Sequence, residues 1–186
     1  MNIKQLQECG VVKKYNQGEF ICFENEEGST AFLLLQGRVE VKLSSFHDKP
    51  KQVAILEPGV IFGEMSLLEN KPRTASVLAV SNQVSVLVIE KNNFIKILQT
   101  DPEIAYNLLR TMINRMESSL DRMKDINIPF IANFRRDKFY PQIKSMTKEQ
   151  FETIICNDSA HAMRIARFLS HSLAEIDKEM SKRGFI

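Results

Sequence analysis

Ile61-Phe-Gly-Glu-Met-Ser-Leu-Leu-Glu-Asn-Lys-Pro-Arg-Thr-Ala-Ser-Val77 is the most informative part of this chain. It begins with a tight turn at Gly63, continues as a short apolar helical turn, and returns through Pro72-Arg73 to a β-branched strand. A short helix offers unpaired backbone N–H groups at its N-terminus, and such groups bind anions, phosphate included. The arginine adds charge-assisted hydrogen bonds, and Glu64 can accept from hydroxyl groups. The pattern therefore predicts a site for a small anion that also carries hydroxyls.

The composition is that of an ordinary globular protein. The 186 residues are 44% hydrophobic and 26% charged, with a formal net charge of +2, which fits one domain with an appendage or two small domains. A net charge this small does not by itself indicate nucleic acid or a membrane as the partner. Cys9, Cys22 and Cys156 lack metal-binding spacing and fit reduced thiols. Without an apolar leader or a run of membrane-spanning length, we expect a cytoplasmic protein with no membrane partner.

Residues 11 to about 90 form a series of short strands separated by turn glycines. Short strands at regular spacing predict an antiparallel sandwich or barrel. The glycines supply the positive φ angles that tight connections need. The expected strands are Val11–Tyr15, Phe20–Glu24, Ala31–Gln36, Val39–Ser44, Gln52–Leu56, Ala75–Val80 and Gln83–Glu90.

The pattern becomes helical after Lys91. A short helix is expected over Asn92–Thr100, and another precedes the strands at residues 2–9. Asp101-Pro102-Glu103 then begins a longer helix, because Asp suits the N-cap and Pro the first turn. Pro129 disfavours helical geometry in the residue before it, so this helix ends near Ile126.

The long helix carries an apolar seam with heptad spacing, in steps of four and three residues and with one polar break. The seam consists of Ala105, Leu109, Met112, Met116, Ser119, Met123 and Ile126. A second apolar flank consists of Ile104, Leu108, Ile113 and Leu120. One interpretation is that the seam only packs on the β-domain of the same chain. We expect instead that the flank packs there and that the seam forms a parallel homodimer through Ala105–Ile126.

The remaining residues, 126–186, are expected to be mostly helical. Asn133–Lys144, rich in basic and aromatic residues, is expected to be a loop. Thr147-Lys-Glu-Gln150 has the residues of a helix start. A long helix is expected over Ala160–Arg183, ending at Gly184.

Gly63-Glu-Met-Ser-Leu-Leu68 and Pro72-Arg-Thr-Ala-Ser-Val77 together resemble the phosphate-binding cassette of cyclic nucleotide-binding domains, the family of catabolite activators and protein kinase regulatory subunits. The ten-residue step from glycine to arginine is the family's own, and the likeness extends over residues 10 to about 125. We therefore expect an α+β fold. It would be an antiparallel, jelly-roll-like β-roll with flanking helices, a long dimerisation helix and a small helical C-terminal segment. Residues 1–125 would be the cyclic nucleotide-binding domain and residues 126–186 the output segment.

The resemblance also implies how the ligand binds. Arg73 would pair with the exocyclic oxygens of the cyclic phosphate, and Glu64 would accept from the ribose 2′-hydroxyl. Backbone N–H groups would hold the phosphate at Ser66, Leu67 and Ala75 and the ribose at Gly63. The ligand-binding residues that the resemblance predicts are Phe62, Gly63, Glu64, Met65, Ser66, Arg73, Thr74, Ala75 and Ser119. The alternative is that Glu64 and Arg73 form a structural ion pair without a ligand.

The identity of the nucleotide depends on two hydroxyls. Thr74 could donate to the phosphate or to a guanine edge, and threonine beside the arginine occurs in family members of both specificities. Ser119 lies roughly where activator-type members place a hydroxyl against the adenine amino group, although it can equally be a tolerated polar residue in the seam. We expect cAMP as the ligand, with cGMP as the alternative.

No motif indicates an enzyme. The sequence has no Walker loop or nucleophile elbow, and His47, His161 and His171 lie outside the cassette without metal-ligand spacing. We expect no catalytic residue, no metal and no cofactor beyond the ligand.

Two outputs are open for the C-terminal segment. The first is a sensor that relays ligand binding through its helices to a protein partner. The second is a transcription regulator of the cAMP receptor type, in which residues 147–169 form a degenerate helix-turn-helix with Ser159, His161 and Arg164 reaching DNA bases. The turn lacks its usual glycine, so DNA is the less favoured partner.

Overall fold

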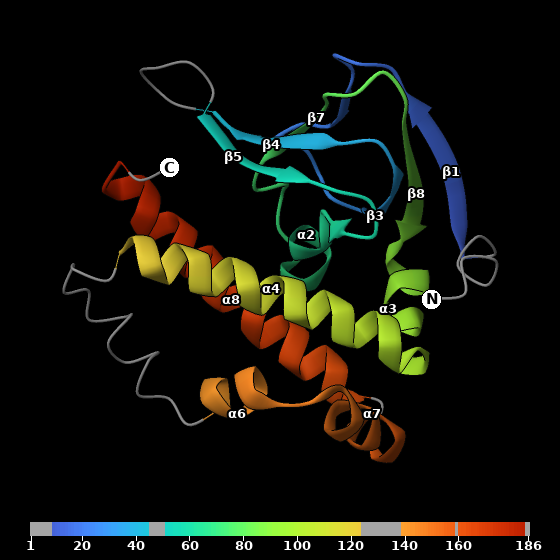
Figure 1. The fold of residues 1–186 in the computed structure, drawn as a ribbon, viewed down its shortest axis with the longest axis vertical. Helices are drawn as coiled ribbons and strands as arrows, with labels where there is room; N and C mark the ends of the chain where they lie inside the picture. Colours follow the sequence, from blue (N-terminus) through green and yellow to red (C-terminus); the bar gives the residue numbers. More distant parts are fainter. Residues whose placement is uncertain (1–8, 45–50, 124–138, 159, 185–186) are drawn as a thin grey trace. The chain divides into compact units, whose positions relative to one another are not determined.

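The computed structural model describes residues 9–44, 51–123, 139–158 and 160–184. Contacts within the chain divide it into two compact units, Met1–Lys96 and Ile97–Ile186, each described by itself below. The first unit contains the strands and the second contains the long helices (Figure 1). The helix expected at residues 2–9 falls almost wholly outside the described residues.

The first unit is built from two four-stranded antiparallel sheets (Figure 1). One has the strand order β1 (Gly10–Tyr15), β8 (Val84–Glu90), β3 (Thr30–Gln36) and β6 (Ile61–Phe62). The other has the order β2 (Phe20–Cys22), β7 (Ser76–Ala79), β4 (Val39–Leu43) and β5 (Lys51–Leu56). The expected α+β fold with an antiparallel β-roll is confirmed. The seven expected strands are present, and the two-residue strand β6 was missed because it is too short to show alternation.

The apolar core of this unit takes side chains from both sheets. Val39, Val77 and Ala79 come from the second sheet, and Phe32, Leu34, Val84 and Val86 come from the first. Phe32 pairs in register with Phe62 on the neighbouring strand, and their rings stack with centroids 5.1 Å apart. This pair matters for function because β6 leads directly into Gly63.

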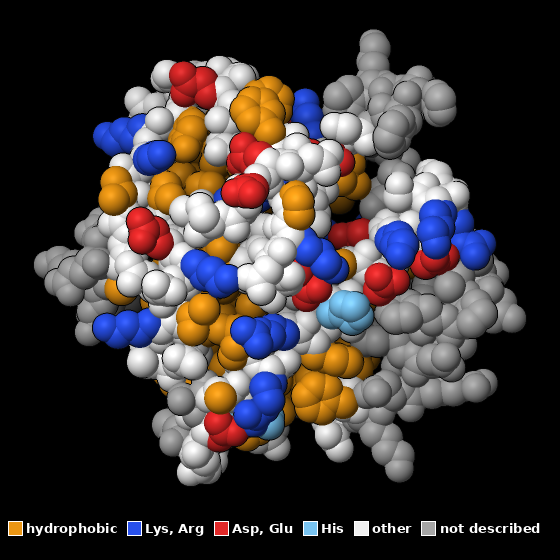
Figure 2. All heavy atoms as spheres, turned by 180° about the vertical axis from the view of Figure 1, so that it is seen from behind, with side chains coloured by type: hydrophobic (Ala, Val, Ile, Leu, Met, Phe, Trp, Pro, Cys, Tyr) orange, Lys and Arg blue, Asp and Glu red, His pale blue; other side chains and the backbone are white. Residues whose placement is uncertain are grey.

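Some large apolar side chains of the first unit remain exposed. Phe20 and Phe23 are 40% and 53% exposed and stack on each other with centroids 4.7 Å apart. Acidic and basic side chains are interspersed on the face shown in Figure 2, as expected for a chain with a net charge of +2. Isolated exposed apolar residues are ordinary on protein surfaces.

Two helices follow the strands. Helix α3 spans Lys91–Thr100, close to its expected bounds, and α4 spans Pro102–Arg122. Asp101 is the N-cap of α4, as expected, and its carboxylate accepts from the backbone N–H of Ile104 at 3.0 Å. This bond satisfies one of the N–H groups that a helix start leaves unpaired.

The second unit is a helical assembly of α4, α6 (Phe139–Ser145), α7 (Lys148–Asn157) and α8 (Ala160–Lys182). Thr147 and Gln150 form the reciprocal capping box that begins α7. Arg115 of α4 donates to Asp177 of α8 at 2.5 Å. The expected starts of α7 and α8 are confirmed.

Helix α6 corrects the expectation of a loop over the whole of Asn133–Lys144. Residues 139–145 are helical, whereas residues 133–138 lie outside the described part of the chain. Pro141 stands in the first turn, where a missing N–H costs nothing. Tyr140 and Ile143 are buried, and Tyr140 also donates to Glu117 of α4. Tertiary packing therefore selects a helix that the local sequence does not strongly favour.

The seam of α4 is buried within the single chain. None of its described members, Ala105 to Met123, is more than 2% exposed, and Ile126 lies outside the described residues. Helix α4 contacts both α7 and α8 of its own unit. This corrects the expectation that the seam is left free for a partner copy, because the folded chain itself already covers these side chains.

The long helix thus groups with the helices that follow it. The chain divides between Lys96 and Ile97 by its contacts, whereas the sequence predicted a boundary at 125/126. An independently folding domain over residues 1–125 stays a prediction.

Met116→Ala tests the packing of the seam. Met116 is fully buried, so truncation should lower the free energy of unfolding of the helical unit by about 2–5 kcal/mol. Asn114→Ala on the exposed face of the same helix is the matched control and should leave that energy nearly unchanged. Urea unfolding followed by circular dichroism measures both. Equal stabilities of the two variants would contradict the burial of the seam.

Candidate functional site

The site begins at the turn that connects β6 to helix α2 (Glu64–Glu69). Gly63 is the N-cap of α2 and has a φ of 72°, a left-handed conformation that favours glycine. A Cβ atom added here would lie 2.7 Å from Nη1 of Arg73 and 3.1 Å from the Phe32 ring. Both the backbone angle and the close approach of Arg73 therefore require glycine at this position.

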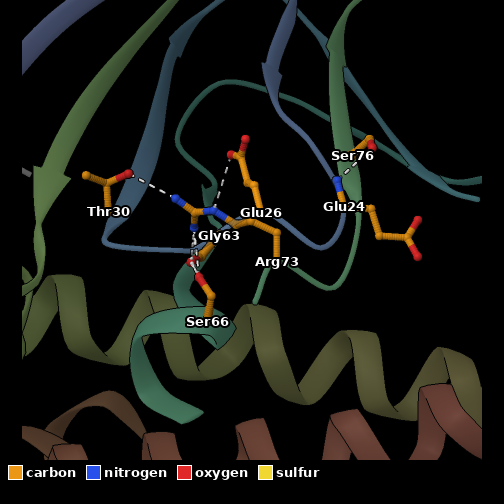
Figure 3. Close-up of polar contacts among 7 residues, drawn as sticks. All are labelled: Glu24, Glu26, Thr30, Gly63, Ser66, Arg73 and Ser76. Carbon is orange, nitrogen blue, oxygen red and sulfur yellow. Dashed lines mark hydrogen bonds and ion pairs between the residues drawn. The ribbon is translucent and has the colours of Figure 1, made fainter. Parts of the chain in front are cut away.

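Arg73 lies at the centre of the site and is only 4% exposed. Its Nη1 donates to the carbonyl of Gly63 at 2.7 Å and to Oγ of Ser66 at 2.8 Å, and its Nη2 donates to Oγ1 of Thr30 at 2.9 Å (Figure 3). The Nε atom has no hydrogen-bond partner among the described residues. A buried cationic N–H group without an acceptor is unfavourable, and an anion satisfies it best.

The Arg73 guanidinium also lies against an aromatic ring and near two carboxylates. The guanidinium lies 5.1 Å from the centroid of the Phe32 ring, a distance at which a cation is attracted to the ring face. Burial lowers the pKa of Arg73 from its ordinary value, and the nearby groups of Cys22, Glu26 and Glu64 oppose this shift. Because burial raises the pKa of the Cys22 thiol to about 11, that thiol is neutral near pH 7. The compensating charges are therefore the two carboxylates.

These two carboxylates differ in position. Glu64 is the first residue of α2 and is 7% exposed, and an acidic side chain is favourable at a helix N-terminus. Glu26 is on the protein surface, with one carboxylate oxygen 3.9 Å from Nε of Arg73. An arginine and a buried carboxylate are thus close enough for the charge of one to act on the other.

The remaining predicted residues of the cassette differ in burial and in whether they contact Arg73. Ser66 is buried, and its hydroxyl donates to the Gly63 carbonyl at 2.9 Å while accepting from Arg73. Phe62 and Met65 are buried, whereas Thr74 is exposed and Ala75 is half-buried. The structure brings Gly63, Ser66 and Arg73 into direct contact with one another.

Ser119 belongs to helix α4 in the other unit. It is 1% exposed, and its Oγ accepts from Nη2 of Arg122 at 3.4 Å. Its predicted role against the adenine amino group stays a prediction.

The sequence did not reveal that the segment from Glu24 to Thr30 contacts Arg73. Asn25 donates its backbone N–H to the Arg73 carbonyl at 2.9 Å, and the Arg73 N–H donates to the Glu26 carbonyl at 2.8 Å. Thr30 then reaches the guanidinium from 43 positions away in the chain. No local pattern signals such long-range contacts, and Gly28 was included only among the turn glycines of residues 11 to about 90.

Gly28 allows the segment to pack closely against the site. A Cβ atom here would lie 2.1 Å from Oγ and 2.4 Å from Cβ of Ser66, and 3.3 Å from Cδ of Arg73.

Among the described residues no group of three or more His, Cys, Asp or Glu side chains is arranged to hold a metal ion. In the same part of the chain no helix has the length and apolar character needed to cross a membrane.

Comparison with known proteins agrees with this geometry. Residues 12–101 match the family model described as the cyclic nucleotide-binding domain. This part of the chain therefore belongs to that family, as the resemblance of the cassette predicted. Its two-sheet fold and flanking helices are those of its structural neighbours.

The relatives below match between half and two thirds of this chain, and the chain spans less than half of their own length. Over 98 residues the chain is 38% identical to the cGMP-dependent protein kinase 2 of Homo sapiens, covering 52% of this chain and 13% of the kinase. It is 29% identical to the cyclic AMP receptor protein of Thermus thermophilus over 105 residues, 56% of this chain and 48% of that protein. A solved structure of a cAMP-binding acyltransferase variant from Mycobacterium smegmatis is similar with a TM-score of 0.56 and 27% identity, covering 63% of this chain and 36% of that one.

Gly28→Ala tests the packing of the Glu24–Thr30 segment on the site. Because the new methyl group would overlap Ser66, the variant should lose about 1–3 kcal/mol of unfolding free energy. Ser66→Gly removes both clashing atoms, so the same change should cost less in that background. Denaturant unfolding of the four chains in this double-mutant cycle measures the coupling. Additive effects would show that Gly28 and Ser66 are not in contact.

Proposed function

We propose that this protein binds a cyclic nucleotide at Arg73, with cAMP preferred over cGMP, and relays the binding to a protein partner. The observation that carries the proposal is the buried Arg73 guanidinium beside the turn at Gly63, whose Nε–H has no hydrogen-bond partner in the described part of the chain. Its position inside a domain of the cyclic nucleotide-binding family supports a cyclic phosphate as the anion.

The proposed contacts follow from the chemistry of the ligand. Nε and Nη2 form one edge of the planar guanidinium and suit two phosphate oxygens. Glu64 is proposed to accept from the ribose 2′-hydroxyl. Backbone N–H groups at the start of α2 and at Ala75 would complete the phosphate site. The Ser66 hydroxyl donates to Gly63 here, so it would have to exchange that bond to become a phosphate donor.

The choice of cAMP stays a proposal. The printed names of the relatives include both nucleotides, with a cGMP-dependent kinase and a cyclic AMP receptor protein among them. Ser119 is retained as the proposed adenine contact and Thr74 as the residue that could favour guanine. Comparative titration with the two nucleotides separates these alternatives.

We further propose that the output is regulatory rather than catalytic and directed to another protein in the cytoplasm. A cyclic nucleotide-binding domain is a regulatory module, and the helices of the second unit provide surfaces that a ligand could reposition. Such a relay requires the ligand to bind one arrangement more tightly than another. A homodimer through Ala105–Ile126 would require the buried seam to leave its packing within the chain.

DNA is the second candidate partner, since one relative is named as a cAMP-activated global transcriptional regulator. Helices α7 and α8 do follow each other closely, but Arg164 is bonded to Asp158 at 2.5 Å and to His161 at 2.8 Å. Ser159 lies outside the described residues. Among the described residues on the face shown in Figure 2, Lys and Arg side chains lie in small groups with acidic side chains between them. A cAMP-dependent, salt-sensitive shift of duplex DNA in a gel would favour this second function.

Arg73→Ala should weaken cyclic nucleotide binding by about thirtyfold or more, because the buried phosphate would lose its charge partner. Isothermal titration with cAMP and cGMP measures the effect, and circular dichroism confirms that the variant folds. Arg73→Lys keeps the charge but loses the planar fork, so it should recover only part of the affinity. Arg38→Ala, at an exposed arginine of the same unit, is the control and should bind like the natural chain. Absence of heat with both nucleotides in the natural chain would contradict the proposed function.

Glu64→Gln tests the ribose contact. The natural chain should bind 2′-deoxy-cAMP about tenfold or more weakly than cAMP, since a hydrogen bond to a charged acceptor is lost. The variant should discriminate much less between the two ligands. Glu69→Gln on the same helix is the matched control and should preserve the full difference. Equal discrimination by Glu64→Gln and the natural chain would remove Glu64 from the ribose site.

A further inference from the structure

We propose that Thr30 is a positioning residue for the ligand-binding arginine: its hydroxyl holds Nη2 of Arg73 so that the Nε edge faces the phosphate. This inference rests on the proposed function, because its consequence is measured as nucleotide affinity. It adds a residue outside the cassette to the site and assigns it a specific atom, Oγ1, which accepts from Nη2 at 2.9 Å (Figure 3).

Thr30 is suited to this task by its place in the fold. It is the first residue of β3 and pairs with Glu90 of β8, while the four residues after it are buried in the core. Its hydroxyl is therefore attached to a strand that cannot move without disturbing the sheet. Arginine, in contrast, has a long side chain with several rotatable bonds, and fixing it in one conformation costs entropy before a ligand arrives.

The guanidinium is held by three groups, two from helix α2 and its N-cap and one from strand β3. Gly63 and Ser66 accept from Nη1, and Thr30 accepts from Nη2. Because the group is planar, fixing both terminal nitrogens also fixes the direction of the Nε–H. Without Thr30 the remaining hydrogen bonds of the guanidinium to described residues both involve Nη1, and the plane could rotate about that anchor.

The contact with Thr30 is compatible with a bound phosphate. Nη2 carries two N–H groups, so one bond to Thr30 leaves a second donor beside Nε. Glu26 cannot replace Thr30 in this role, since its carboxylate is on the surface and lies 3.9 Å from Nε. Its negative charge would also oppose an incoming phosphate. Thr30 is neutral and orients the fork without competing for its charge.

The test uses three variants of the full chain with cAMP and cGMP as probes. Thr30→Val keeps the shape of the side chain and removes the acceptor, so we expect about tenfold weaker binding. Thr30→Ser restores the hydroxyl and should restore the affinity. Ser76→Ala is the matched control, because Ser76 anchors the neighbouring Glu24 backbone N–H at 2.9 Å without a hydrogen bond to the Arg73 side chain. It should bind like the natural chain.

The outcomes separate this inference from the proposed function. No binding by the natural chain would reject the proposed function itself. Binding by the natural chain together with unchanged binding by Thr30→Val would reject the role of Thr30 alone. Failure of Thr30→Ser to restore affinity, or an equal loss in Ser76→Ala, would show that the segment matters only for packing. If Thr30→Val does not fold, Thr30→Ala and Thr30→Ser give the same comparison, with thermal unfolding recorded for each.

Discussion

The site depends on the burial of one cation. The Arg73 guanidinium is removed from water, and such a group is stable only where acceptors and negative charges surround it. Its acceptors are a carbonyl and two hydroxyls, and the nearby carboxylates supply the charge. The left-handed turn at Gly63 and the missing side chain at Gly28 both make room for this arrangement. Much of the local backbone therefore follows from the need to accommodate one side chain.

The β-roll provides the rigid frame that this arrangement requires. Strand β3 contributes Phe32 to the core, where it stacks on Phe62 and faces the guanidinium, and it begins with Thr30. The same strand thus supplies a core side chain and a hydrogen-bond acceptor for Arg73. The second unit, in contrast, is helical. The apolar seam of its long helix is buried within the chain, so any relay to a partner must act through surfaces other than that seam or must first release it.

The limits of prediction from sequence can be seen at particular residues. The cassette at residues 61–77 was recognisable because its glycine, acidic residue and arginine lie within one short segment. The helix start at Asp101 was recognisable for the same local reason. Helix α6 was missed because Phe139–Ser145 has little local helical preference and forms where Tyr140 and Ile143 become buried. The expectation that the α4 seam is left free for a partner copy was wrong because a heptad pattern does not indicate which surface covers the apolar residues.

The sequence by itself determined most of the strands and helices, though not β6 and α6, together with the turn at Gly63 and the presence of Glu64 and Arg73 in one cassette. These properties arise from local conformational preferences and from the chemistry of neighbouring residues. Only the tertiary structure decided that Thr30 and the Glu24–Gly28 segment surround Arg73, and that the seam is buried within one chain. Contacts between residues some forty positions apart depend on how the sheets pair and pack, and no local pattern encodes that pairing.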